Sequence, residues 1–228
     1  MTQLIRKLVF SKVMASIFLK PLLKLHSFSY SFSGMYASIL NGGIHPKHRI
    51  MKYKEWFLDN LHKDWVVLDI GCNTGMMPEV FSKKVSFVYG IEIDCNMIER
   101  ALKERSYDNI EYICADATTY NYDNLQSVDC ITLSNVLEHI ENRIEFLNEI
   151  VNNIKWNATK RILIRVPMID REWIAVYKKE LDLEYRLDNT HFVEYTFAQF
   201  KQELQQANIS IMEFEIKFGE IYAVCVAD

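Results

Sequence analysis

Cysteine pairs with metal-binding or redox spacing are missing from this sequence. The five cysteines, at positions 72, 95, 114, 130 and 225, form no Cys-x-x-Cys pair, and four of them lie in or beside apolar runs. Cysteine in such surroundings usually behaves as a small hydrophobic residue. The sequence therefore predicts five reduced thiols in a cytoplasmic protein.

Acidic residues are missing from the first 54 positions, which hold nine lysines or arginines. The rest of the chain has 17 basic and 30 acidic residues, so a net charge of −4 conceals a basic head on an acidic body. An acidic body makes a poor surface for binding nucleic acid. Nucleic acid is therefore not an expected partner.

Long apolar runs are also missing. Lys12 and Lys20 interrupt the apolar stretch near the N-terminus, and no small-residue cleavage pattern follows it, which argues against a secretory signal. No run reaches the roughly 20 apolar residues that a membrane span needs. Two interpretations of residues 1–25 stay open: a basic apolar anchor at the inner membrane face, or helices packed on the body or in a homodimer.

From residue 65 onward, short β-branched runs alternate with helical patterns, which is typical of a parallel sheet covered on both faces. Two further runs near the C-terminus, separated by "FGE", predict an antiparallel hairpin at the edge. The expected strands are residues 65–71, 87–93, 110–116, 128–134, 161–167, 209–217 and 221–227, and the expected helices lie within 78–85, 96–105, 142–154 and 196–207.

These elements predict the α/β class, with a Rossmann-like, open, mostly parallel seven-stranded sheet. We expect a helical N-terminal arm over residues 1–50 and one domain over residues 51–228, with an insertion at about 168–195 that shapes a substrate site. The segment "GGIHPKHR" (42–49) is a candidate lid.

The turn "GCNTG" (71–75) follows the first expected strand, where ligands bind in such sheets. A dinucleotide fingerprint would need glycine at positions 73 and 76, which are Asn and Met, so NAD is disfavoured. Glu92, at the end of the second strand, can accept hydrogen bonds from a ribose diol. Asp116, at the end of the third strand, can accept from an adenine amine.

Four motifs in order, "VLDIGCNTG", "GIEID", "CADAT" and "LSNVLEHI", each end a successive strand. The series resembles the cofactor-binding motifs of class I S-adenosylmethionine-dependent methyltransferases, over about residues 50–228. The resemblance implies S-adenosyl-L-methionine as cofactor. It also implies a role for each matching residue: Asp69 at the methionine amino group, Gly71, Asn73 and Gly75 in the turn, Glu92 on the ribose, Asp116 and Ala117 at adenine, and Asn135 near the methionine.

Some acceptors are disfavoured by what the chain lacks. With no adjacent prolines it cannot contain the Asp/Asn-Pro-Pro-Tyr motif of many amino methyltransferases, and no Pro-Cys nucleophile suits cytosine C5. His139 and His191 are the candidate catalytic bases, because a histidine pKa near neutrality suits that role. Asp188 and His191 could contact a cation, but two ligands do not define a site, so no metal is predicted.

The segments "IRVPMIDREW", "LDNTHFVEYT" and "FGEIYA" are similar to methyltransferases of bacterial surface polysaccharide and glycan pathways. This second resemblance implies a sugar hydroxyl as acceptor, on a free or a lipid-linked glycan. Two alternatives stay open: a methyltransferase of a lipid or quinone-like small molecule, and a membrane-associated binding protein that has the fold without turnover.

Overall fold

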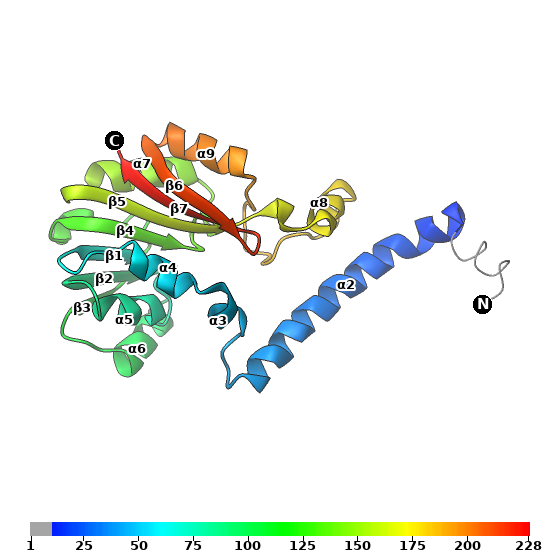
Figure 1. Cartoon of the computed structure of the whole chain (residues 1–228), viewed down its shortest axis with the longest axis horizontal. Helices are drawn as coiled ribbons and strands as arrows, with labels where there is room; N and C mark the ends of the chain where they lie inside the picture. Colours follow the sequence, from blue (N-terminus) through cyan, green and yellow to red (C-terminus); the bar gives the residue numbers. More distant parts are fainter. Residues whose placement is uncertain (1–10) are drawn as a thin grey trace. The chain divides into compact units, whose positions relative to one another are not determined.

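A seven-stranded sheet is the framework of the protein. The computed structural model describes residues 11–228, so the first ten residues of the expected arm lie outside the described part. The strands lie in the order β3-β2-β1-β4-β5-β7-β6 (Figure 1). The pairs β5–β7 and β6–β7 are antiparallel, and the pairs β1–β2, β1–β4, β2–β3 and β4–β5 are parallel.

The five parallel strands form where β-branched and apolar residues cluster. In β1, Val67, Leu68 and Ile70 are buried, as expected for a central strand covered on both faces. The strands are β1 (Val66–Ile70), β2 (Phe87–Glu92), β3 (Ile110–Cys114), β4 (Val128–Ser134) and β5 (Trp156–Pro167). β5 begins five residues before the predicted strand, because Trp156 pairs with Val128 beyond a bulge.

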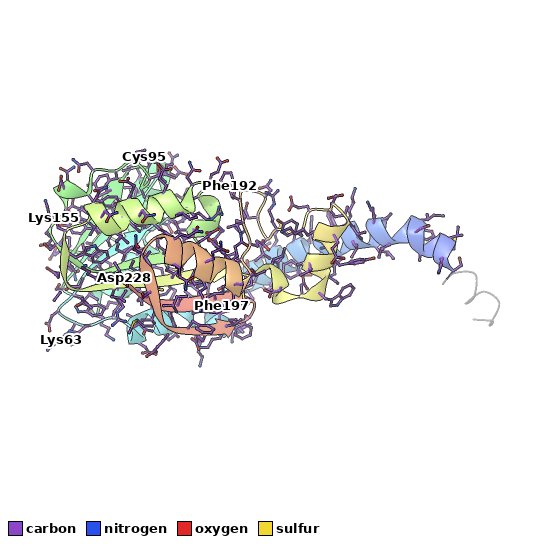
Figure 2. The ribbon with its side chains drawn as sticks, turned by 90° about the horizontal axis from the view of Figure 1, so that it is seen from above. Lys63, Cys95, Lys155, Phe192, Phe197 and Asp228 are labelled. Atoms are coloured by element: carbon purple, nitrogen blue, oxygen red, sulfur yellow. A yellow bond between two sulfur atoms is a disulfide. The ribbon has the colours of Figure 1, made fainter. Side chains whose placement is uncertain are left out.

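Helices cover both faces of the sheet (Figures 1 and 2). The first set is α4 (Tyr53–Asp59), α5 (Met76–Ser82) and α6 (Cys95–Glu104), and the second is α7 (Arg143–Asn153) and α9 (Phe197–Gln206). Two of them have side-chain N-caps. Asp94 accepts from the backbone nitrogen of Asn96 at 2.9 Å, and Thr196 accepts from that of Gln199 at 3.2 Å.

The C-terminal hairpin closes the sheet. β6 (Ile209–Lys217) pairs antiparallel with β7 (Glu220–Ala227), and β7 also pairs antiparallel with β5. The pairing of Pro167 with Glu220 brings the end of β5 to the start of β7. The predicted fold class and the antiparallel edge are therefore confirmed.

The core lies between the sheet and the two helical layers. It combines alternate strand residues with the inward faces of α7 and α9. The largest side chains that are almost completely buried include Phe146, Phe200, Tyr195 and Tyr222. A continuous core of this kind holds the strand ends in register, and those ends carry the predicted site.

The chain divides into two compact units. One comprises residues up to Lys52 together with Tyr177–Tyr185, and the other holds the remaining residues. The first unit contains α2 (Lys12–Leu40) and α3 (Lys47–Met51), where Lys178 donates a 2.8 Å hydrogen bond to Ser27 Oγ. η3 (Ile169–Arg171) and α8 (Trp173–Glu180) lie within the predicted insertion.

No helix in the described range, residues 11–228, combines the length and the apolarity needed to cross a membrane. α2 nevertheless exposes large apolar side chains along its length, among them Phe18, Leu22, Phe28 and Tyr36. Its charged residues are Lys12, Lys20 and Lys24.

The expectation of five reduced thiols is wrong for two of them. Cys95 and Cys114 form a disulfide with a Cα–Cα distance of 5.2 Å, while Cys72, Cys130 and Cys225 are buried free thiols. Cys95 begins α6 just after β2, and Cys114 ends the neighbouring β3, where it pairs with Glu92. Strand order brings together two residues that are 19 apart in sequence. The cysteines therefore give no support to the cytoplasmic prediction.

Candidate active site

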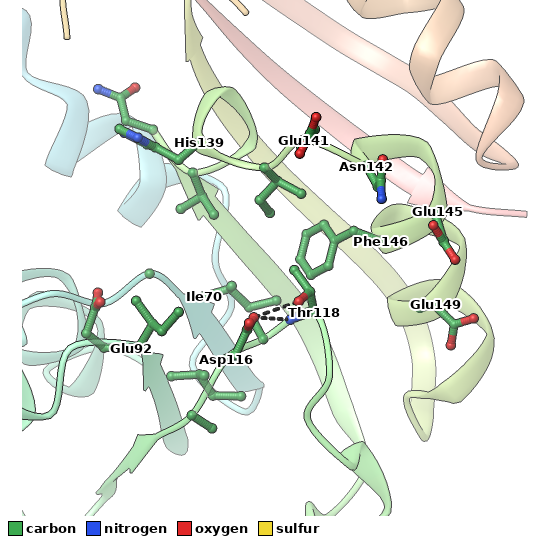
Figure 3. A pocket seen from close by; sticks show the side chains of 18 of the residues that line it. Ile70, Glu92, Asp116, Thr118, His139, Glu141, Asn142, Glu145, Phe146 and Glu149 are labelled. Atoms are coloured by element: carbon green, nitrogen blue, oxygen red, sulfur yellow. Dashed lines mark hydrogen bonds between the residues drawn. The ribbon is translucent and has the colours of Figure 1, made fainter. Parts of the chain in front are cut away.

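A cavity of about 890 Å³ opens at the carboxyl ends of the parallel strands (Figure 3). It lies where β1 has β2 on one side and β4 on the other, the place at which the strand order reverses. Its size falls within the usual range for small-molecule sites. The lining includes Gly71, Asn73, Glu92, Asp116, Ala117, Asn135 and His139, seven of the ten residues predicted for the site.

The turn after β1 requires glycine at both ends. Gly71 and Gly75 have φ angles of 72° and 78°, in the left-handed region that favours glycine. A Cβ at Gly71 would lie 2.6 Å from Cγ2 of Val136, and one at Gly75 would lie 2.4 Å from the Tyr112 hydroxyl oxygen. The backbone is therefore left-handed at both glycines, and the space beside each glycine is filled by the chain itself.

Glu92 joins this turn to the end of β2. Its Oε2 accepts from the backbone nitrogen of Asn73 at 2.9 Å, and its Oε1 accepts from that of Asp94 at 3.1 Å. Asn73 has a φ of 47°, and its Oδ1 accepts from the nitrogen of Thr74. The carboxylate is thereby held at the cavity wall, with lone pairs left for a ligand diol.

Asp116 lies in the cavity wall just beyond β3. Its Oδ1 accepts from both the backbone nitrogen and the hydroxyl of Thr118, at 2.9 and 2.7 Å (Figure 3). Among residues 11–228 the other carboxylate oxygen has no hydrogen-bond partner, and Ala115 and Ala117 belong to the same cavity lining. This arrangement leaves one oxygen to accept from an exocyclic amine.

Asp69 lies behind the cavity wall, apart from the lining residues. Its side chain is buried beside β4, where Oδ1 accepts the hydroxyl of Thr132. Burial raises the pKa of Asp69 to about 7, with Thr132 opposing the shift and Glu92 adding to it. The structure therefore shows a carboxyl that holds two central strands together beneath the turn.

Asn135 follows β4 and has a φ of 57°, which asparagine tolerates better than most residues. Its backbone nitrogen donates to the carbonyl of Arg165 at 2.8 Å. Its Oδ1 is buried and has no hydrogen-bond partner in residues 11–228, although the residue lines the cavity. A buried acceptor at a cavity wall can be satisfied by a bound donor, such as an ammonium group.

The two candidate bases lie side by side. The rings of His139 and His191 pack edge to face with centroids 4.6 Å apart. His139 follows β4 in η2 (Leu137–His139) and reaches the cavity, whereas His191 is buried and is not among the lining residues. Partial desolvation and the neighbouring His191 lower the pKa of His139 below the usual value of a histidine.

Hydrogen bonding determines the tautomer of His139. Thr190 donates its only hydroxyl proton to Oδ1 of Asp188 at 2.7 Å, so the same hydroxyl can only accept from Nδ1 of His139, 3.0 Å away. The ring therefore carries its proton on Nδ1. A lone pair is left on Nε2.

Sequence reasoning did not anticipate that Glu138 would be completely buried. Its exposed fraction is 0%, and neither carboxylate oxygen has a hydrogen-bond partner among the described residues 11–228. Burial raises the pKa of Glu138 to about 8. The motif "NVLEHI" drew attention to the residue, but the pattern contains no signal for its environment.

Comparison with known proteins follows from this geometry. Residues 68–158 match the family model described as a methyltransferase domain. That segment holds three of the four strand-end motifs entirely and most of the first. The matched segment begins within β1 and ends within β5. The fold of the chain is Rossmann-like, as in the solved methyltransferase structures that it resembles.

Curated relatives match only part of this chain. An uncharacterized protein, MJ1452, from Methanocaldococcus jannaschii is 33% identical over 92 residues, which is 39% of this chain and 36% of that protein. A ubiquinone biosynthesis O-methyltransferase from Coxiella burnetii is 34% identical over 76 residues, 32% of each chain. The matches thus span about a third of the length of these relatives.

Solved structures share the fold. An S-adenosylmethionine-dependent methyltransferase from Aquifex aeolicus has a TM-score of 0.59 and 18% identity, over 77% of this chain and 89% of that one. A Haloferax volcanii putative methyltransferase, in complex with a Trm112 activator, has a TM-score of 0.64 and 13% identity, over 80% and 92%. At such identities the likeness concerns the fold alone.

S-adenosylmethionine is the cofactor of this domain class, and the cavity fits it. Glu92 and Asp116 offer carboxylate acceptors, which suit a ribose diol and an adenine amine, at the ends of the adjacent strands β2 and β3. The unpartnered Oδ1 of Asn135 belongs to the same lining and suits an ammonium donor. The chemistry of this wall is therefore compatible with the cofactor.

Proposed function

We propose that the protein is an S-adenosylmethionine-dependent O-methyltransferase of a small molecule. One observation carries the proposal: His139, with a lone pair on Nε2, lines the same cavity as Glu92 and Asp116. A group that can take a proton thus faces the cofactor site. Such a group is needed for a hydroxyl acceptor, which must lose a proton as its oxygen is methylated.

In this proposal the residues of the chain position the two reactants. When bound, S-adenosylmethionine supplies an electrophilic methyl group on its sulfonium. Glu92, Asp116 and Asn135 would hold the nucleoside and methionine parts, and the acceptor oxygen would lie between the methyl group and His139. The hydroxyl proton would pass to Nε2 as the carbon–oxygen bond forms. Positioning of this kind supplies a large share of the rate enhancement in bimolecular reactions.

For the acceptor we propose a lipid or quinone-like hydroxyl compound. Support comes from the partial match to a protein named as a ubiquinone biosynthesis O-methyltransferase, and from the apolar residues that α2 exposes beside its three lysines. A sugar hydroxyl of a glycan precursor, implied by the resemblance of residues 164–173 and 187–196, is the alternative acceptor. The inner membrane face, proposed for residues 1–25, suits a lipid-soluble acceptor.

The test is transfer of a radiolabelled methyl group from S-adenosylmethionine to a panel of acceptors. The panel contains polyprenylated catechols in vesicles, short-chain catechols, sugar nucleotides and lipid-linked glycans. We expect label in the prenylated catechols. Label in the sugars alone would favour the glycan enzyme, and cofactor binding without transfer to any hydroxyl would favour a binding protein.

Two histidine variants test the role of the cavity wall. His139→Ala is expected to lower turnover about 10²–10⁴-fold while leaving cofactor affinity unchanged. The matched control is His62→Ala, because the His62 side chain is 60% exposed and outside the cavity lining. Unchanged turnover in His139→Ala would contradict a catalytic role for this residue.

A further inference from the structure

Three side chains that carry metal-ligand atoms meet beside the cavity. The ligand atoms of Glu138, His139 and His191 all lie within 4.8 Å of one another. Glu138 and His139 belong to η2 after β4, and His191 comes from the segment that follows α8. The backbone nitrogen of Phe192 donates to the carbonyl of Glu138 at 2.7 Å, which joins the two segments directly.

Glu138 supplies the observation that points to a ligand. Its side chain is completely buried, yet within the part of the chain that the structure describes neither oxygen has a hydrogen-bond partner. Buried carboxylates in native proteins are paired, hydrogen-bonded or bound to a metal. The rings of His139 and His191 make no hydrogen bond to either carboxylate oxygen of Glu138. A bound cation would supply the missing partner of this carboxylate.

Both imidazoles are oriented in the manner of metal ligands. The hydroxyl of Thr190 accepts from Nδ1 of His139. Nδ1 of His191 lies 3.4 Å from Oε1 of Glu194, a buried carboxylate that is paired with Arg171. Metal-binding histidines usually donate their second ring nitrogen to a carboxylate or another oxygen. Each ring is therefore held with its Nε2 lone pair available.

We propose that Glu138, His139 and His191 bind a divalent first-row transition cation, such as Zn²⁺ or Mn²⁺, at the edge of the cofactor cavity. Two imidazoles and one carboxylate suit these ions, whereas Mg²⁺ prefers oxygen ligands alone. With bonds of about 2.1 Å, tetrahedral ligand atoms lie about 3.4 Å apart. The three ligand atoms must therefore move closer together to bind a cation. Rotation of the exposed His139 side chain can bring its ring nitrogen closer to the other two.

The cation would leave a coordination position open toward the cavity, as in catalytic sites with three protein ligands. This role rests on the proposed function. An acceptor hydroxyl bound there would have a lowered pKa and would lose its proton to solvent, and the oxygen would then take the methyl group as the carbon–sulfur bond breaks. His139 would act as a ligand, and the cation would replace it as the group that activates the hydroxyl.

The primary test is calorimetric titration of the chelator-treated, dialysed full-length protein with ZnCl₂, MnCl₂ and MgCl₂. We expect one site per chain, with Zn²⁺ bound more tightly than Mn²⁺ and Mg²⁺ bound weakly. Glu138→Gln and His139→Ala should each weaken Zn²⁺ binding at least tenfold. The matched control is Glu141→Gln, which changes an exposed carboxylate in the same cavity lining and should bind Zn²⁺ normally.

Thermal unfolding provides a second readout that is independent of activity. Zn²⁺ should raise the melting temperature of the wild-type protein and of Glu141→Gln, and should leave that of Glu138→Gln unchanged. If Glu138→Gln fails to fold, His139→Ala still tests the site. The His139 side chain is exposed, so its removal should not prevent folding. Absence of a Zn²⁺ site, or a site that both variants retain, would overturn the proposal.

Cofactor titration and turnover separate this proposal from the proposed function. Loss of methyl transfer on chelation, restored by Zn²⁺ or Mn²⁺, supports the catalytic role of the cation. If the protein binds the metal but methyl transfer continues after chelation, the catalytic role of the cation is overturned. The metal site itself then remains. Methyl transfer without any metal site overturns the cation alone and leaves His139 as the base.

Discussion

Oε2 of Glu92 lies 2.9 Å from the backbone nitrogen of Asn73, so one carboxylate joins the end of β2 to the turn after β1. Through its second oxygen it also holds the nitrogen of Asp94, the N-cap of α6. A single side chain therefore organises three segments around the predicted ribose site. The turn therefore depends on the same carboxylate that is proposed to bind the ribose.

Substitution of Glu92 by Gln should weaken the binding of S-adenosylmethionine and S-adenosylhomocysteine. The amide keeps one acceptor but loses the charge, and hydrogen bonds to a charged group contribute about 1.5–3 kcal/mol each. We expect at least a tenfold rise in the dissociation constant, measured by calorimetry. Glu99→Gln, on the exposed face of α6, is the control. Equal affinity in both variants would remove Glu92 from the ribose site.

Gly71→Ala should destabilise the fold more than Gly42→Ala does. Both glycines have a φ near 70°, so both variants incur backbone strain of about 1–2 kcal/mol. Only the Cβ at residue 71 meets another group, Cγ2 of Val136 at 2.6 Å, whereas nothing lies within 4 Å of one at residue 42. We expect a further loss of about 1–3 kcal/mol for Gly71→Ala in urea unfolding. Equal losses of stability would show that the Val136 side chain moves away from the new Cβ without an energetic cost.

Asp69 should make the protein less stable as the pH rises from about 4 to about 7. The folded state holds the proton until its raised pKa near 7, whereas the unfolded chain releases it near 3.8. Each unit of pKa difference corresponds to about 1.4 kcal/mol of stability, which is fully present below the unfolded-state pKa and is lost as the pH rises to about 7.

Asp69→Asn should flatten that dependence, because the amide oxygen can still accept the Thr132 hydroxyl. The free energy of unfolding, measured from pH 4 to pH 8, should fall less steeply with pH in Asp69→Asn than in the wild type. Asp108→Asn, at an exposed turn, should follow the wild type. Parallel curves for all three proteins would contradict a protonated Asp69.

Reduction of the Cys95–Cys114 disulfide should lower the free energy of unfolding by about 3 kcal/mol, the loop-entropy value for a link of this length. The measurement is urea unfolding with and without a phosphine reductant. Cys95→Ser/Cys114→Ser is the control, since its stability should not respond to the reductant. A wild-type protein equally insensitive to reductant would show that the bond is absent in solution.

Predicted and observed strands agree closely where local signals are strong. β2 and β4 begin at the predicted residues, and the hairpin of β6 and β7 has the expected partners. Thr196 caps α9 as its spacing with Gln199 indicates. Apolar runs, turn residues and caps act over a few residues, so the sequence alone was sufficient for them. The start of β5 depends on pairing with Val128 across a bulge and was missed.

The sequence by itself determined the succession of strands and helices along the chain, the glycines of the turn and the carboxylates at the strand ends. Each of these depends on local periodicity or on one motif. Only the tertiary structure decided that Cys95 reaches Cys114, that Asp69 lies behind the cavity, and that Glu138 meets His139 and His191. These relationships join residues up to 63 positions apart. The order of the strands within the sheet and the burial of side chains bring these residues together, and neither is encoded in any short stretch of the chain.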